Sequence, residues 1–343
     1  MPNKSRKRAL VLSGGGGRGA YHVGVLRFLE EHDWLPDVVV GTSIGAVNGA
    51  AIASGHNAYS LWALWQRLRT NDVQKANLNP LEGTYLLDTA PLRETLQKEG
   101  WVNFDRINSE DAAVHLRITA TEVNSGHLHV FGNSPDVFPS RLEIEPIELD
   151  HIIASCSIPV VYPATQLHEH LYWDGATVAN TPLGPAIDAG AEEIVVVIMT
   201  PWDDDREVIK EPPGNILSSL SYTLEWALLA SFQADLKLFR RVNDLVRLQV
   251  ENARLRAANA ALMAQLKGDE FVFDDVNKNG IPDVLEKEFR QLPDPIIVGP
   301  KRPIPVDRII RYTLDGHKEL YQMGYEDAKR AWREAGKSVE GEL

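Results

Sequence analysis

Several protein classes are excluded by what this sequence lacks. Its 343 residues include a single cysteine, Cys156, which excludes an internal disulfide and a cysteine-based zinc site. We interpret Cys156 as a buried structural thiol rather than a catalytic one. No apolar run approaches the roughly 18 residues of a membrane-spanning helix, and the run at 9–12 is too short for the hydrophobic region of a signal peptide. We therefore expect a cytoplasmic protein.

Positive charge is also scarce. Lys and Arg number 35 against 48 Asp and Glu, a formal net charge of −13. This balance argues against a general nucleic-acid binder, which needs a basic surface. The hydrophobic share of 44% and the charged share of 24% are typical of a globular chain with a substantial core. The basic cluster at 4–8 is interpreted as a solvated tail, with peripheral contact to anionic membrane lipid as the alternative.

The first 200 residues alternate between strand-like and helix-like segments. A glycine run and a helix with apolar residues at helical spacing follow the first strand, and a helix of small residues follows the second. This order predicts an α/β fold with a mostly parallel, doubly wound sheet. Strands are expected at 9–13, 37–42, 115–123, 128–131, 166–173 and 193–199.

The segment 41–45 matches the pattern G-x-S-x-G. In this pattern the serine occupies a strained strand-to-helix turn, and Gly41 and Gly45 allow close passage of the backbone. The helix that begins behind Ser43 would stabilise a developing negative charge. A β-branched strand precedes the motif and a small-residue helix follows it, as a nucleophile elbow requires.

A run of glycines lies between the first strand and the first helix. It consists of Gly14, Gly15, Gly16, Gly17, Arg18 and Gly19. One interpretation is a phosphate-binding G-x-G-x-x-G turn, and the other is an oxyanion hole built from backbone N–H groups. The dinucleotide interpretation needs an acidic residue after the second strand. That strand instead leads into Ser43, so a nucleotide-binding protein is the weaker alternative.

A Ser-His-Asp triad would need a histidine base beside Ser43. None of the ten histidines, which are scattered along the sequence, lies in a motif that marks it as that base. Asp174 stands out because it ends a predicted strand and leads into Gly175 and Ala176, whose small side chains leave room beside the carboxyl group. An ordinary aspartate, with a pKa near ~3.9, is a poor base at neutral pH. Burial beside the serine would raise that pKa.

Together, the segments 13–19, 41–45 and 174–176 resemble the patatin-like phospholipase family in its bacterial-type form. The resemblance covers residues 8–200 and implies a three-layer α/β/α catalytic core, completed by a helix at 307–336. It also implies that Ser43 is the nucleophile and Asp174 its only partner, with the backbone of 14–17 as the oxyanion hole. Arg18 would lie at the mouth of the site, near a phosphate or the oxyanion. Cofactors are not required for this chemistry.

A helical insertion is expected at 201–306. Within a long helix at 216–267, leucines and asparagines recur with heptad spacing, and Asn occupies two a positions. The interpretations are a helix packed on its own domain or a homodimer formed through 238–266.

A second motif, at 275–286, fits the calcium-loop pattern D-x-[DN]-x-[DN]-G-x5-E. The spacing places oxygen ligands around one cation, and two Asn in place of Asp lower the ligand charge. The candidate calcium ligands are Asp275, Asn277, Asn279, Ile281 (through its carbonyl), Asp283 and Glu286.

The sequence thus predicts a serine-dependent lipid acyl hydrolase of the phospholipase A or lysophospholipase type. Two alternatives remain open. One is an acyltransferase that uses the same acyl-enzyme, and the other is a lipid-binding scaffold regulated by calcium and the coiled coil.

Overall fold

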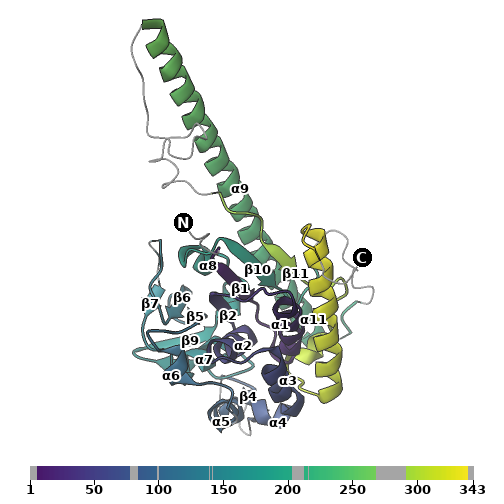
Figure 1. Cartoon of the computed structure of the whole chain (residues 1–343). Helices are drawn as coiled ribbons and strands as arrows, with labels where there is room; N and C mark the ends of the chain where they lie inside the picture. The colour runs from purple at the N-terminus through teal and green to yellow at the C-terminus, as the bar shows by residue number, and fades with distance from the viewer. Residues whose placement is uncertain are drawn as a thin grey trace. The chain divides into compact units, whose positions relative to one another are not determined.

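The structure is a computed structural model (Figure 1) that describes residues 6–77, 84–98, 100–138, 140, 142–202, 212–214, 216–267 and 291–338. The candidate calcium loop at 275–286 lies outside the described residues. The strands are β1 (Arg8–Leu12), β2 (Val38–Thr42), β3 (Lys75–Ala76), β4 (Leu87–Asp88), β5 (His115–Glu122), β6 (Leu128–Gly132), β7 (Leu142–Ile144), β8 (Thr165–Leu167), β9 (His170–Asp174), β10 (Glu193–Val197) and β11 (Ile296–Val298).

The helices are α1 (Ala20–Glu31), α2 (Ile44–Ala53), α3 (Ala58–Arg67), α4 (Thr70–Val73), α5 (Ala90–Lys98), α6 (Phe104–Ile107), α7 (Leu149–Ser155), α8 (Gly184–Asp188), α9 (Ile216–Lys267) and α11 (Leu314–Glu334). Three short 3₁₀ helices are η1 (Gly16–Gly19), η2 (Gly175–Thr177) and η3 (Val306–Ile309).

A mostly parallel sheet forms the centre of the molecule. Its strand order is β11-β10-β1-β2-β5-β6-β7, and the pairs from β11 to β5 are all parallel. The expected hairpin is present, because β5 and β6 pair in antiparallel fashion. The strand expected at 166–173 is instead an antiparallel hairpin of β8 and β9, and β9 pairs in turn with β5.

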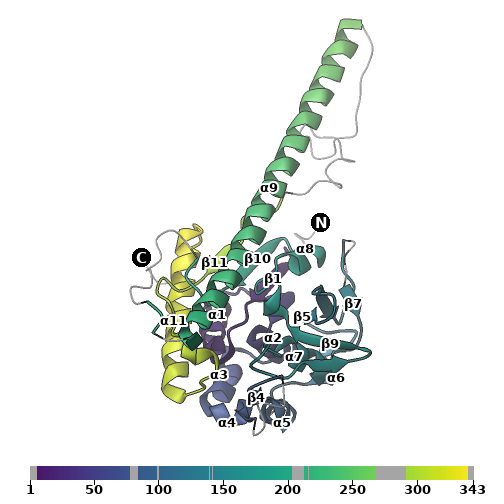
Figure 2. The ribbon, with the colours of Figure 1, turned by 180° about the vertical axis from the view of Figure 1, so that it is seen from behind.

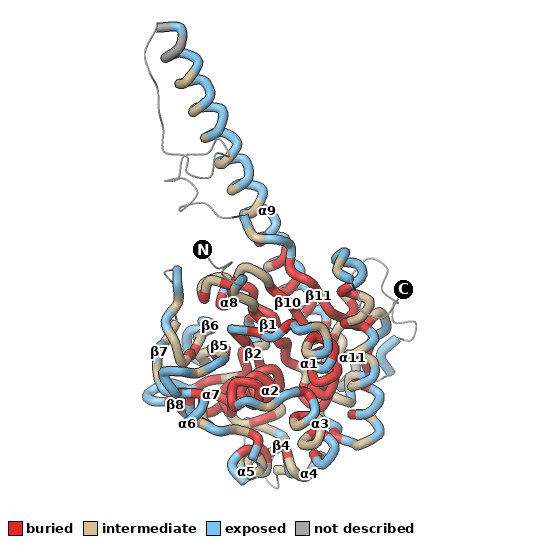
Figure 3. The backbone as a smooth tube through the Cα atoms, in the orientation of Figure 1, coloured by how far each residue is buried: buried red, intermediate tan, exposed pale blue. Residues whose placement is uncertain are grey.

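Helices cover both faces of this sheet. Alternate residues of the buried strands point to opposite sides, so both faces carry apolar side chains that must be covered. Leu10, Leu12 and Val39 join the main core cluster with residues of α1, α2 and α11. Val11 and Val40 are equally buried but face the other side, where α8 packs against β1 and β2. Figures 1 and 2 show α1 and α11 side by side, and Figure 3 shows the buried backbone concentrated in the central strands and their helices. The fold predicted from the sequence is confirmed.

The chain divides into two compact units. One comprises 1–233 and 295–343, and the other comprises 234–294. This division differs from the expected insertion at 201–306, because β11 belongs to the central sheet and the first turns of α9 belong to the first unit. The closing helix is α11, which starts at Leu314 rather than at 307 because η3 precedes it and Thr313 caps it. Among the described helices, none has a stretch that is long and apolar enough to cross a membrane.

Candidate active site

Ser43 lies in the turn between β2 and α2. Its backbone has φ 58° and ψ −126°, a conformation that side-chain-bearing residues rarely adopt. The Ser43 N–H donates to Ser155 Oγ at 2.8 Å. The turn also passes very close to β1, since a Cβ on Gly45 would lie 2.2 Å from the Leu12 carbonyl oxygen. Ser43 therefore has the strand–turn–helix setting of a nucleophile elbow, at the positive end of α2.

The register of β5 brings Asp174 to Ser43. Thr42, the last residue of β2, pairs with Thr119 of β5. The next residue of β5, Ala120, pairs with Asp174 at the end of β9. Because β6 occupies the other edge of β5 at this position, β9 takes the edge that β2 has just left. The last residue of β9 thus arrives beside the residue that follows β2.

The Asp174 carboxylate is buried and accepts a hydrogen bond from the Ala176 N–H at 2.8 Å. Burial raises the pKa of Asp174 to about 7, although the neighbouring Ser43 side chain and the Ala176 N–H lower it. The backbone of Asp174 is fixed as well. Its N–H donates to the Ser157 carbonyl at 2.8 Å, and its own carbonyl accepts from Thr121 Oγ1 at 3.1 Å. A rigid carboxylate that titrates near neutrality is suited to proton transfer.

All ten histidines lie within the described residues, and none of their hydrogen bonds reaches Ser43 or Asp174. His22 is the deepest of those near the glycine run. Burial lowers its pKa to about 3, so this ring is neutral, and its Nδ1 lies 3.2 Å from Asn48 Nδ2. The arrangement around Ser43 is thus a pair rather than a triad.

The glycine run borders Ser43 directly. A Cβ on Gly14 would lie 3.0 Å from the Ser43 Cβ and 2.7 Å from Asn180 Oδ1. The Gly14 N–H donates to that oxygen at 2.8 Å. Among the described residues, the N–H groups of Gly15 and Gly16 donate to no protein group. Asn180 was not predicted from the sequence; its only local mark is its place six residues after Asp174.

The position of Arg18 differs from the expectation. Its guanidinium is buried and forms two hydrogen bonds with the Glu225 carboxylate, at 2.9 and 3.1 Å. A third hydrogen bond, at 2.9 Å, reaches the Ile304 carbonyl. The side chain is therefore held inside the protein and not at the mouth of the site. The expectation treated Arg18 as part of a local motif, whereas Glu225 and Ile304 lie more than 200 residues away in sequence.

Three consecutive residues at the end of α7 also support the pair, and the sequence did not mark them as functional. Ser155 and Ser157 bind the backbones of Ser43 and Asp174, as described above. Cys156 lies between them, buried as predicted, and its thiol neighbours Ser43 and Asp174. Burial raises the pKa of this thiol, and the nearby Asp174 raises it further, which keeps it neutral. The single cysteine thus belongs to the wall of the site.

Among the described residues, Glu145, His151 and His168 form a cluster whose potential metal-ligand atoms all lie within 4.8 Å of one another. His151 Nδ1 accepts from the Glu148 N–H at 2.9 Å, which assigns the ring proton to Nε2. Nε2 in turn lies 3.0 Å from Glu145 Oε1 and donates to it. The ring nitrogen that faces the cluster therefore has no free lone pair for a metal, and the group is a hydrogen-bonded structural cluster.

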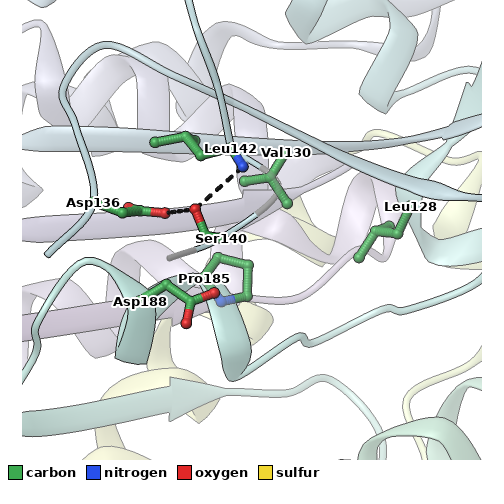
Figure 4. A pocket seen from close by; sticks show the side chains of 7 residues that line it. All are labelled: Leu128, Val130, Asp136, Ser140, Leu142, Pro185 and Asp188. Atoms are coloured by element: carbon green, nitrogen blue, oxygen red, sulfur yellow. Dashed lines mark hydrogen bonds between the residues drawn. The ribbon is translucent and has the colours of Figure 1, made fainter. Parts of the chain in front are cut away.

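A surface pocket of about 570 Å³ lies between β6, β7 and α8 (Figure 4). The Ser140 hydroxyl lies between the Asp136 carboxylate and the Leu142 N–H. Burial raises the pKa of Asp188 in this pocket, and Asp136 adds to the effect. No residue of the Ser43–Asp174 pair or of the glycine run lines it. The pocket is therefore separate from the candidate active site.

Comparison with known proteins gives a family match over residues 10–187, described as "Patatin-like phospholipase". This span covers about half of the chain and includes Ser43 and Asp174. The chain belongs to the patatin-like phospholipase family, which confirms the resemblance seen in its motifs.

Curated relatives include "Lysophospholipase NTE1" of Debaryomyces hansenii, 27% identical over 195 residues, which are 57% of this chain and 12% of that protein. Human "Patatin-like phospholipase domain-containing protein 6" is 27% identical over 200 residues, 57% of this chain and 14% of that protein. The chain thus spans about an eighth of the length of these relatives. Among solved structures, VipD from Legionella pneumophila aligns with a TM-score of 0.43 and 13% identity, covering 96% of this chain and 67% of that one.

Proposed function

We propose that this protein is a serine-dependent lipid acyl hydrolase in which Ser43 and Asp174 form a catalytic dyad. The observation that carries the proposal is a strained, buried serine that the register of β5 places beside a buried carboxylate with a pKa of about 7. The same unit belongs to a family of lipid ester hydrolases.

In the proposed reaction, the ionised Asp174 removes the hydroxyl proton as Ser43 Oγ attacks the carbonyl carbon of a lipid ester. The resulting tetrahedral intermediate collapses to an acyl-serine, and the protonated Asp174 returns the proton to the departing alcohol oxygen. Water then attacks the acyl-serine with Asp174 again as the base, releasing the fatty acid. A pKa of about 7 is suited to both directions of proton transfer at neutral pH.

The oxyanion is stabilised by backbone N–H groups of the glycine run. Because the Gly14 N–H already donates to Asn180, we assign this role to Gly15 and Gly16, with the positive end of α2 contributing. Asn180 then acts on catalysis by fixing the position of the run rather than by contacting the substrate.

Two neighbouring segments fit the entry of an acyl chain. The N–H groups of Leu86 and Leu87 donate to the Val160 and Val161 carbonyls at 2.8 to 3.2 Å, which places the two apolar segments side by side. The side chains of Leu86 and Val160 are exposed by 51% and 61%. Tyr162, at the end of this loop, is buried, and its pKa is raised by burial and by its interaction with the nearby Asp174. The exposed apolar side chains of Leu86 and Val160 therefore lie at an entry that leads toward Ser43 and Asp174.

The experiment is a fluorophosphonate labelling of the full chain, with the adduct located by peptide mass, followed by hydrolysis assays on a lysophospholipid and a diacyl phospholipid. The expected result is an adduct on Ser43, and loss of nearly all hydrolysis in both Ser43→Ala and Asp174→Asn. Asp111→Asn changes an exposed carboxylate in a turn and serves as the matched control. A folded protein with no adduct, or a near wild-type rate in Asp174→Asn, would overturn the dyad. Transfer of the acyl group to added glycerol in preference to water would reassign the enzyme as an acyltransferase.

A further inference from the structure

The part of α9 that lies in the 234–294 unit presents a stripe of exposed leucines, which we call the leucine seam. Their exposed fractions are between 54% and 75%, far above those of ordinary helix core residues. They recur at alternating three- and four-residue steps when Asn252 and Asn259 are included, which is the a and d spacing of a heptad repeat. The leucines of the seam are Leu245, Leu248, Leu255, Leu262 and Leu266.

The opposite face of the helix is already used within its own unit. Asn243 forms two hydrogen bonds with the backbone of Leu292, at 2.8 and 3.1 Å. Residues that follow Asn243 on the same face are partly covered, namely Val246, Val250, Ala253, Ala257 and Ala261. Within the described residues, this face is therefore less exposed than the leucine seam.

We propose that the leucine seam binds the same seam of a second copy of this chain, as a parallel, in-register, two-stranded coiled coil. Leucine at d with an occasional asparagine at a is typical of parallel dimers. In a parallel dimer, Asn252 faces the second copy's Asn252, so the amides bond to one another. In an antiparallel pair, each asparagine would face a leucine at d, and its buried amide would lack a partner.

Charge complementarity supports the same register. In the heptad, Glu251 occupies a g position and Arg256 the following e position, and both are exposed. In a parallel dimer, g of one helix lies next to the following e of the other. Glu251 then pairs with the second copy's Arg256, twice per dimer. Among the described residues of one chain, Glu251 makes an exposed contact of 3.6 Å with Arg254, which contributes little.

A membrane surface is the competing occupant, and the pattern disfavours it. Helices that lie on membranes have a broad apolar face. Here the apolar stripe is restricted to a and d, is interrupted by Asn252 and Asn259, and is flanked by Gln249, Glu251 and Arg256. A narrow, interrupted stripe fits another helix better than it fits lipid.

The first measurement is the mass of the full chain by sedimentation equilibrium at ~1 to ~50 μM, since three heptads give moderate affinity. We expect a monomer–dimer equilibrium in the wild type and a monomer in Leu248→Glu/Leu255→Glu. Arg247→Glu, at an exposed c position off the seam, is the charge control and keeps the dimer. A wild-type monomer throughout this range would overturn the proposal. Binding of the wild-type chain to lipid vesicles would then be measured. Loss of this binding in Leu248→Glu/Leu255→Glu would assign the leucine seam to a membrane.

Charge and cysteine variants test the register and the direction of the dimer. Glu251→Arg and Arg256→Glu each place like charges next to one another across the dimer and raise its dissociation constant about fivefold. The double variant exchanges the two charges and restores the wild-type dissociation constant. In a parallel dimer, the two copies of Leu245→Cys face each other at an a position and form a disulfide. The native Cys156 does not compete, because it is buried. Cross-linking of Leu245→Cys to Leu262→Cys in a mixture, in preference to either self-linked product, would refute the parallel arrangement.

Discussion

The buried carboxylate of Asp174 makes a quantitative prediction about stability. Because burial raises its pKa from 3.8 to about 7, the native protein binds the proton more tightly than the unfolded chain does. Proton binding therefore favours the native state, and the free energy of unfolding falls as the pH rises from about 4 to about 7. Asp174→Asn keeps the shape of the side chain and an acceptor oxygen but never ionises. The free energy of unfolding of this variant therefore does not fall in this way as the pH rises.

The size of the effect follows from the shift. About three pKa units at ~1.4 kcal/mol each correspond to about 4 kcal/mol at pH 8, where the native carboxylate is charged. At pH 5 the unfolded chain has released its proton but the native chain has not, and the difference is only about 2 kcal/mol. The stability gained by Asp174→Asn should therefore grow by about 2 to 3 kcal/mol between pH 5 and pH 8.

Urea unfolding of the wild type, Asp174→Asn and the exposed control Asp111→Asn at both pH values measures this difference, with the transition of the catalytic unit followed by tryptophan fluorescence. Asp174→Asn is expected to be inactive and yet more stable at pH 8. A gain in stability that is the same at pH 5 and pH 8 would refute a raised pKa for Asp174, and with it the proposed base.

Two further predictions concern the glycine run and the calcium loop. Glu225→Gln leaves the buried Arg18 without its counter-charge, so we expect a loss of about 3 kcal/mol in unfolding free energy and a lower kcat. Glu94→Gln, which breaks an exposed pair with Lys98 at 3.1 Å, serves as the control and has little effect on either. For the loop, calorimetry is expected to show weak calcium binding, with a dissociation constant of about 10⁻⁵ to 10⁻³ M, that is lost in Glu286→Gln; the absence of heat in the wild type would refute the motif.

The settings of Ser43 and Asp174, proposed here as the nucleophile and its partner, were predictable because each residue carries a local sequence mark. Gly41 and Gly45 flank Ser43 for a steric reason that acts over a few residues, and Asp174 ends a strand before two small residues. The parallel order of the sheet was also predictable, since apolar strands alternate with helices. These features depend on short stretches of chain and on the period of the hydrophobic pattern.

What escaped prediction depends on contacts between distant parts of the chain. The position of Arg18 is determined by Glu225, and the Gly14 N–H is occupied by Asn180. Neither pairing follows from spacing or periodicity, because each requires the folded arrangement of several elements. The boundary of the insertion escaped for the same reason, since the short strand β11 is recognised only by its pairing with β10.

The site combines two unfavourable features that a fold selected for stability alone would avoid. Ser43 has a strained backbone, which costs on the order of 1 to 3 kcal/mol, and Asp174 is a carboxylate removed from water. Both are fixed by specific hydrogen bonds, from Ser43 to Ser155 and from Ala176 to Asp174. Because Asp174→Asn would relieve one cost and leave the packing intact, an aspartate at this position is best explained by a requirement for a charge that comes and goes near neutral pH. The same reasoning applies to the strained serine, because its turn conformation is what a nucleophile elbow needs and what an ordinary core residue does not.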